Sequence, residues 1–247
     1  MSKSEYSAGF TVLREDQWCI AVSKPAGLLT QAPPGIDSLE SRIKRYLSNT
    51  RKMEEVYLGV PHRLDRPASG CMIFAKTRLA ARRLAEQFQQ RRVRKVYWAL
   101  VEGLVAQPSG HWVDYVRKII DEPRGEVVAK DEPNAQRAEL RYECLERNSD
   151  FSWLQIELLT GRMHQIRLQA STRGHPLKGD LLYGARTTFA AVYEDPRFNA
   201  IALHARKLEL VHPVTEKPLV IEAPVNEVWQ QLIGEKENNG TLTTRAV

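Results

Sequence analysis

The chain has 247 residues, of which 43% are hydrophobic and 27% charged, and these values are typical of one large or two small globular domains. Lys and Arg outnumber Asp and Glu by 36 to 30, and the net charge of +6 is compatible with a polyanionic partner without requiring one. No apolar run approaches the roughly 20 residues of a membrane span, and the polar start lacks the apolar core of a signal peptide, so we expect a cytoplasmic protein with no membrane contact.

The first part of the chain predicts short strands and two helices. Apolar β-formers between turn residues predict strands at Phe10–Arg14, Trp18–Ser23, Val56–Val60 and Cys71–Ala75. Asp37 or Ser38 can cap a helix to about Leu47, and Thr77 can cap another to about Gln90. In the second helix, Ala80, Leu84 and Phe88 recur at i, i+4 and i+8, which predicts one apolar stripe with arginines on the remaining surface.

The pattern after residue 92 is mostly extended. Residues Gln136–Arg147 alternate apolar and charged, which predicts a half-buried antiparallel strand that pairs with Phe151–Leu159. Further elements are predicted as strands at Val93–Glu102, Ile201–Val211 and Leu219–Ala223 and helices at Arg162–Thr172 and Val225–Ile233, with a loop at Ala185–Asn199. We therefore predict an α+β fold: one domain over residues 10–233, built on a mostly antiparallel mixed sheet flanked by helices, with flexible ends at 1–9 and 234–247.

Residues 76–95 concentrate positive charge. They contain eight basic side chains and one acid, Glu86. Such a block offers phosphate contacts, and it equally suits a solvated helix face.

The densest candidate site is residues 62–70, HRLDRPASG, where Pro67 and Gly70 are expected to fix a polar loop after a strand. Asp65 lies between Arg63 and Arg66, and a carboxylate among cations suits a nucleophile or a base in an anion-binding cleft. A loop ion pair or a backbone cap explains the same residues, and composition alone favours that structural role.

Two further stretches carry candidate residues. In residues 159–167, LTGRMHQIR, Gly161 is expected to turn the chain into a helix whose first-turn amides and Arg162 can take a phosphate. Arg167 lies more than a turn later and can hold a different anion, although both arginines also suit an exposed helix face. Tyr97, in a basic predicted strand, offers a ring on which a base can stack, or packs in the core.

Metal and cofactor motifs are missing from the sequence. The three cysteines form no CxxC pair, and the histidines form no HxH or HExxH pair. The sequence contains no Walker loop, no GxGxxG and no GxSxG. We expect no metal, no cofactor and no serine nucleophile.

Taken in order, these stretches resemble the RluA-type family of RNA pseudouridine synthases. The resemblance is carried by residues 24–30 (KPAGLLT), 62–70, 94–97 (RKVY), 159–167, 174–184 (GHPLKGDLLYG), 203–205 (LHA) and 212–213 (HP), and it covers roughly residues 10 to 225. Ala68 stands where Thr is usual in the second stretch. Many members carry a small RNA-binding domain before the catalytic part, and here the first strand begins near residue 10, so the short form resembles members that act on tRNA or a small stem-loop.

The resemblance implies a cofactor-free isomerisation of uridine to pseudouridine, with Asp65 as the catalytic carboxylate. Asp65 would attack the ribose anomeric carbon, attack the base, or remove the 2′ proton, and the sequence does not choose among these routes. Arg167 matches the arginine that pairs with this Asp, Tyr97 matches the aromatic residue that stacks on the target uracil, and Arg63 matches the residue that fills the gap left by a flipped base. RNA or uridine contacts are expected from these neighbours: His62, Arg63, Arg66, Lys95 and Arg162.

Structured RNA is the implied partner of a monomeric enzyme, with tRNA preferred and ribosomal RNA open. A base-removing glycosidase is disfavoured because that reaction uses a second carboxylate, and the matched stretches contain only Asp180, in a Gly-Asp turn that is expected to be structural. A non-catalytic RNA-binding module is the alternative of another class, and it would not require Asp65.

Overall fold

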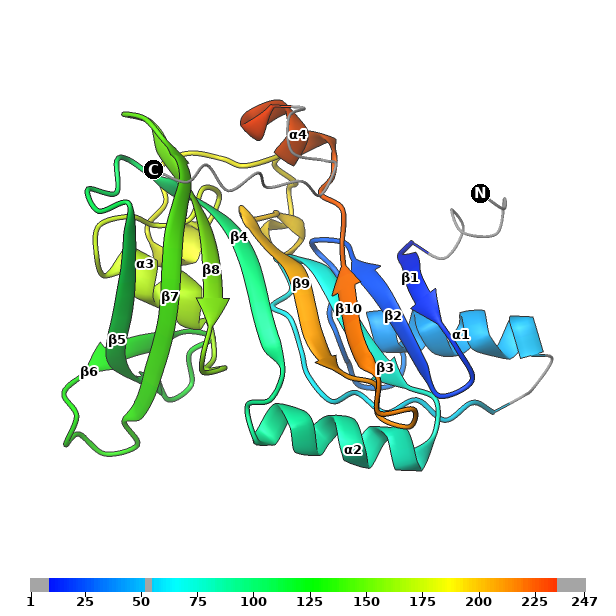
Figure 1. Ribbon diagram of the computed structural model, residues 1–247. Helices are drawn as coiled ribbons and strands as arrows, with labels where there is room; N and C mark the ends of the chain where they lie inside the picture. The colour runs from blue at the N-terminus through cyan, green and yellow to red at the C-terminus, as the bar shows by residue number, and fades with distance from the viewer. Residues whose placement is uncertain (1–8, 52–54, 235–247) are drawn as a thin grey trace, which may run out of the picture.

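The computed structural model describes residues 9–51 and 55–234, and within them ten strands form one sheet (Figure 1). The strands are β1 (Thr11–Glu15), β2 (Cys19–Lys24), β3 (Ser69–Ala75), β4 (Arg94–Glu102), β5 (Ser109–Lys118), β6 (Gly125–Val128), β7 (Gln136–Arg147), β8 (Phe151–Leu158), β9 (Leu203–Val211) and β10 (Pro218–Glu222). Their order is β1-β2-β3-β9-β4-β8-β7-β5-β6, and β10 pairs with β9. Every pair is antiparallel except β3 with β9, so the predicted mixed, mostly antiparallel sheet is confirmed.

Four α-helices and two short 3₁₀ helices accompany the sheet in the described residues. They are α1 (Leu39–Arg51), α2 (Arg78–Gln89), α3 (Gln165–Ser171), α4 (Glu227–Ile233), η1 (Leu181–Tyr183) and η2 (Pro196–Phe198). Figure 1 shows α1 behind β1, β2 and β3, and α3 behind β5, β7 and β8. The Thr77 hydroxyl accepts the Ala80 N–H at 3.2 Å, which confirms the predicted cap of α2.

Strand β4 shows how the two faces of the sheet differ. Alternate side chains point to opposite faces, so Tyr97 lies in the main core with α1 and the first strands, whereas Trp98 and Leu100 lie in a second cluster. That second cluster contains Trp153 and Trp229, the latter from α4. Tyr97 is therefore directed to the face of the sheet opposite to α4.

The parallel contact between β3 and β9 requires a glycine. Gly70 has φ +121°, and a Cβ placed there would lie 2.3 Å from the carbonyl oxygen of Ala205. Beside it, Ser69 Oγ and His204 Nδ1 are 2.8 Å apart. The glycine of the HRLDRPASG stretch thus lets the loop that carries Asp65 end against the middle of the sheet.

Two predicted elements are wrong in detail. Residues 56–60 form no strand, because only Gly59 bridges to Ala75 and the chain then leaves the sheet at Pro61, which has no N–H to donate. The helix predicted from Arg162 begins at Gln165, because His164 adopts a left-handed φ of 52° that a continuous helix does not allow. Residues 103–135, for which no element was predicted, contain β5 and β6.

Candidate active site

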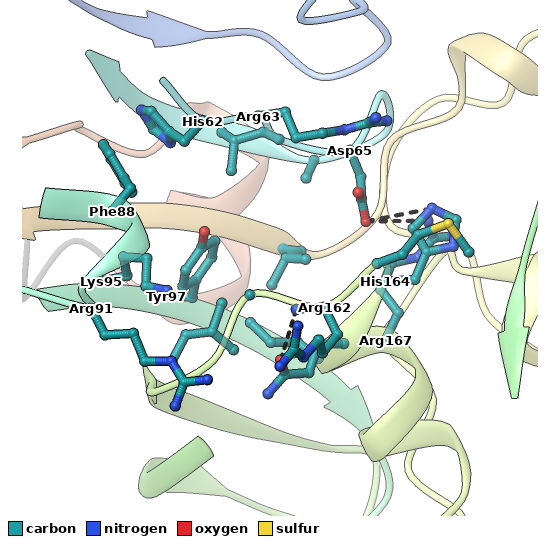
Figure 2. Close-up of a pocket in the computed structure, with 18 of the residues that line it drawn as sticks. His62, Arg63, Asp65, Phe88, Arg91, Lys95, Tyr97, Arg162, His164 and Arg167 are labelled. Atoms are coloured by element: carbon teal, nitrogen blue, oxygen red, sulfur yellow. Dashed lines mark hydrogen bonds and ion pairs between the residues drawn. The ribbon is translucent and has the colours of Figure 1, made fainter. Parts of the chain in front are cut away.

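A cavity of about 560 Å³ lies where the Asp65 loop, the end of α2 with the start of β4, and the segment before α3 meet (Figure 2). Its lining brings together most of the residues singled out from the sequence: His62, Arg63, Asp65, Lys95, Tyr97, Arg162 and Arg167. Three segments, with residues as far apart in the chain as Asp65 and Arg167 (102 positions), therefore build one site. Arg66 does not line the cavity.

The loop that carries Asp65 is fixed from behind by the KPAGLLT stretch. Lys24 is fully buried, and its ammonium donates hydrogen bonds to the carbonyls of Pro25, Leu28 and Arg66. Burial lowers the pKa of Lys24 to about 7, while the nearby Asp65 acts in the opposite direction. The Thr30 hydroxyl donates to the Leu64 carbonyl at 3.0 Å and accepts the Leu64 N–H at 3.1 Å, so the residue before Asp65 is held on both sides.

Asp65 faces a buried ion pair. Arg167 donates from Nε and Nη2 to the two carboxylate oxygens of Asp180, at 2.6 and 2.7 Å, and its remaining Nη1 lies 3.4 Å from Asp65 Oδ2. The side chains of Arg167 and Asp180 are 5% and 1% exposed, whereas that of Asp65 is 19% exposed. Asp180 therefore fixes the guanidinium plane, and the guanidinium in turn holds Asp65 at the cavity surface.

His164 approaches the same oxygen of Asp65. Its Nε2 lies 3.8 Å from Asp65 Oδ2, and its Nδ1 lies 3.0 Å from the hydroxyl of Tyr183. That hydroxyl also accepts the Gly125 N–H at 3.0 Å. Desolvation by burial, the largest influence, lowers the pKa of His164, and the neighbouring Asp65 opposes this shift. His164 therefore favours its neutral form.

Tyr97 forms the inner wall of the cavity. Figure 2 shows its ring in the cavity wall between the segments that carry His62 and Arg162. Tyr97 as a whole residue is 8% exposed, and burial raises the pKa of its phenol. Tyr97 thus stays protonated, and it offers a ring that can stack on a base and a hydroxyl that can exchange a proton.

The other end of the cavity is cationic. Figure 2 shows Lys95 and Arg91 on the opposite side of Tyr97 from Asp65. Among the described residues, no carboxylate and no hydrogen-bond acceptor pairs with the side chain of either cation. Burial, with a further contribution from Arg91, lowers the pKa of Lys95 to about 8. We call Arg91 and Lys95 the Lys95 end, and Asp65, His164 and Arg167 the Asp65 end.

The remaining predicted contact residues have distinct positions. His62 stacks on Phe88 with ring centroids 4.4 Å apart, and its Nε2 accepts the Ile73 N–H at 3.1 Å. Burial lowers the pKa of His62 to about 3, so it is a neutral wall residue. Arg66 donates from Nε to the Gly27 carbonyl, and its guanidinium lies 4.8 Å from the ring centre of Phe198, outside the cavity.

Arg162 lies in the cavity wall but does not begin a helix, which corrects the prediction. Its guanidinium donates to the Arg137 carbonyl and to the Gln136 side chain, both at 3.0 Å. Its backbone N–H donates to the side chain of Gln165 at 3.0 Å. The N–H of Arg162 is therefore already accepted by a side chain of the protein, and a phosphate at this position would have to compete with Gln165 for it.

The basic block of residues 76–95 divides in the fold. Lys76 is buried against Glu15, Arg83 lies against Glu216 at 3.5 Å, and Arg94 lies between Glu157 and Glu209. Only Arg91 and Lys95 of its cations line the cavity. The charge run is thus partly a set of structural ion pairs and partly a cationic wall.

One trio within the described residues brings possible metal ligands within 4.8 Å of one another, namely Asp16, Cys19 and His212. His212 Nδ1 accepts the N–H groups of Val214 and Thr215, and its Nε2 lies 2.9 Å from Asp16 Oδ2, so both ring nitrogens are engaged by the protein. Burial raises the pKa of the Cys19 thiol to about 12, which keeps it protonated. The ring nitrogens of His212 in this trio are thus engaged in hydrogen bonds within the protein.

Three residues at the site were not assigned roles from the sequence. Asp180 was expected to be structural, and the structure shows that it orients Arg167. His164 and Tyr183 were given no site role, although both lie in stretches that carry the family resemblance. Their position in those stretches was a signal, but no spacing rule places them beside Asp65.

Comparisons with known proteins agree on one family. The model of the family described as RNA pseudouridylate synthase matches residues 19–172. The chain is 31% identical over 226 residues to the ribosomal large subunit pseudouridine synthase C of Vibrio vulnificus, covering 90% of this chain and 68% of that protein. It is 30% identical over 242 residues to the tRNA pseudouridine synthase C of Salmonella typhi, covering 94% of this chain and 91% of that protein.

A solved structure shows the same fold. The chain superposes on human RNA pseudouridylate synthase domain containing 4 with a TM-score of 0.71 at 22% identity, covering 87% of this chain and 88% of that one. Among the described helices, none combines the length and the apolar character needed to cross a bilayer.

Proposed function

The chain belongs to the RNA pseudouridylate synthase family, which isomerises uridine to pseudouridine in RNA, and from this premise we propose that Asp65 is its catalytic carboxylate. One observation carries the assignment: the carboxylate at the cavity surface is held by an arginine whose other two nitrogens are bound by a buried acid. A carboxylate pre-positioned in this way needs little reorganisation when it reacts.

The reaction is an internal exchange of bonds. The N1–C1′ bond of uridine breaks, a C5–C1′ bond forms, the C5 proton leaves and N1 gains a proton, so atoms and electrons balance without a co-reactant. The Asp65 carboxylate starts the exchange by attacking C1′, by attacking the base, or by removing the 2′ proton. All three routes place a carboxylate oxygen at the junction of ribose and base, where the exposed edge of Asp65 meets the cavity.

The cavity walls suit a flipped uridine. A cavity of about 560 Å³ has room for one nucleoside, and a base that enters it leaves its stack at a cost of a few kcal/mol. Tyr97 supplies a replacement stacking partner and a hydroxyl for proton transfer. Arg63, in the same loop as Asp65, fills the gap that the flipped base leaves in the RNA helix.

Structured RNA is the substrate class, and we choose tRNA as the first target, acted on by a monomeric cytoplasmic enzyme. The relative named for tRNA is matched over 91% of its length, whereas the relative named for the ribosomal large subunit is matched over 68%.

Pseudouridine mapping in cellular RNA with and without the gene tests this function. We expect one or a few tRNA positions to lose pseudouridine, and the same positions to be modified in vitro by the purified wild-type protein. Loss of a pseudouridine from ribosomal RNA would instead show that ribosomal RNA is the substrate. The absence of any lost position, together with no turnover of tRNA or ribosomal RNA in vitro, would contradict the proposed function.

A further inference from the structure

Two donors converge on one oxygen of Asp65. Both Arg167 Nη1, at 3.4 Å, and His164 Nε2, at 3.8 Å, face Oδ2. Among the described residues, none gives Oδ1 a hydrogen bond, and the shortest approach of both donors is to Oδ2. The carboxylate thus presents Oδ1 without a hydrogen bond from the protein.

The hydrogen bonds of Tyr183 favour a proton on Nε2 of His164 over one on Nδ1. The hydroxyl oxygen accepts the Gly125 N–H at 3.0 Å, and the only acceptor within reach of its own hydrogen in the described residues is His164 Nδ1, also at 3.0 Å. A neutral imidazole that accepts at Nδ1 carries its hydrogen on Nε2. The Nε2–H is then directed toward Asp65 Oδ2.

The backbone of His164 is unusual for a residue with a side chain. Its φ of 52° lies in the left-handed region, which asparagine and glycine adopt more easily, and the ring makes no capping hydrogen bond to α3. Neither backbone conformation nor capping therefore accounts for a histidine here. The contacts of the ring with Asp65 and Tyr183 account for the histidine.

Charge explains why a neutral ring suits this position. The Arg167–Asp180 pair is neutral as a unit, so Asp65 brings a net charge of −1 to the cluster. A neutral Nε2–H orients this charge without cancelling it, whereas an imidazolium would cancel it and weaken the carboxylate as nucleophile or base. The charged and titratable groups around the ring are Asp65, Arg167, Asp180, Arg63 and Tyr183.

We propose that His164 is a positioning residue: held as the Nε2–H tautomer by Tyr183, it fixes Asp65 through Oδ2 and leaves Oδ1 as the reacting oxygen. This role rests on the proposed function of Asp65. The 3.8 Å separation shortens to a hydrogen bond when the substrate excludes water from the cavity.

Histidine-selective ¹⁵N NMR tests the tautomer without any RNA. In the wild-type protein we expect the ring of His164, assigned by its loss in His164→Asn, to be protonated on Nε2 and unprotonated on Nδ1. In Tyr183→Phe, which keeps the ring but removes the hydroxyl, we expect a mixture of tautomers. A wild-type ring protonated on Nδ1, or an unchanged spectrum in Tyr183→Phe, would overturn the proposal.

Single-turnover kinetics test the positioning, with the RNA in which wild-type protein forms pseudouridine. His164→Asn and His164→Gly both accept the left-handed backbone, so we expect the maximal rate to fall about 10- to 100-fold in each, the effect of losing one hydrogen bond to a charged group, with RNA affinity unchanged. Tyr183→Phe should lower the rate less. A full rate in the two His164 variants, or a loss confined to RNA affinity, contradicts the proposal.

The two tests separate this inference from the proposed function. If wild-type protein forms no pseudouridine in any RNA, the function of Asp65 fails, and NMR still reports the tautomer. If wild-type protein is active and both His164 variants keep the full rate, only the role of His164 fails.

Discussion

The two ends of the cavity differ in whether their cationic side chains have partners within the protein. At the Asp65 end, Lys24 behind the loop and Arg167 beside the carboxylate each have hydrogen-bonding or anionic partners in the protein. At the Lys95 end, Arg91 and Lys95 have none among the described residues. The difference indicates that one end is completed by the fold and the other by the substrate, as expected where chemistry needs fixed geometry and RNA binding needs unpaired charge.

The largest effect that separates the two ends is expected from Asp65→Asn. The variant keeps the shape of the side chain but removes the carboxylate, so pseudouridine formation should be abolished while RNA affinity is largely kept. Radiometric or mass-spectrometric turnover and a filter-binding titration measure the two quantities. Turnover that survives the substitution would place the catalytic carboxylate elsewhere.

Asp180→Asn tests whether the Asp65 end depends on its buried support. Arg167 would keep its charge but lose its buried partner, which costs about 3–5 kcal/mol of unfolding free energy, and the maximal rate should fall as well. Denaturant unfolding and single-turnover kinetics measure the change. Asp195→Asn is the matched control, because it breaks an Arg–Asp pair whose arginine, Arg197, is 73% exposed, and we expect it to leave both quantities unchanged.

Arg91→Gln and Arg94→Gln compare an unpaired arginine of the Lys95 end with a paired arginine three residues later in the chain. Arg91 lines the cavity, whereas Arg94 lies between two glutamates. For one phosphate contact, loss of Arg91 should reduce the slope of log affinity against log salt by about 1, and loss of Arg94 should not change it. Equal slopes in the two variants would contradict the division of the basic block.

The smallest expected effect is a pH dependence of RNA binding. Burial lowers the pKa of Lys95 to about 8, so its positive charge is present below that pH and is lost as pH rises through it. RNA affinity should therefore fall by a few-fold between about pH 7 and about pH 9, since one of the phosphate-binding charges disappears. Lys95→Arg stays charged over this window and should remove the dependence, and binding titrations at several pH values would show whether it does.

Local pattern predicted most of the sheet. The clean alternation of residues 136–147 gave the bounds of β7, and Thr77 with its apolar stripe gave α2, because these patterns depend only on neighbours in the chain. The helix start at Arg162 was wrong because His164 takes a left-handed conformation that propensity does not predict. The strand predicted at 56–60 was wrong because an apolar run does not show whether a neighbouring strand is available to pair with it.

The sequence by itself determined the family resemblance, the fold class and the choice of Asp65. Motif order and the periodicity of apolar residues depend only on the order of residues along the chain. Only the tertiary structure decided what surrounds Asp65. It brought Asp180 to Arg167, Tyr183 to His164, and Arg91 to Lys95, and it paired Arg94 with distant glutamates. The physical reason is that pairing depends on distances across the sheet, so the same arginine-rich run holds both a structural cation and a free one.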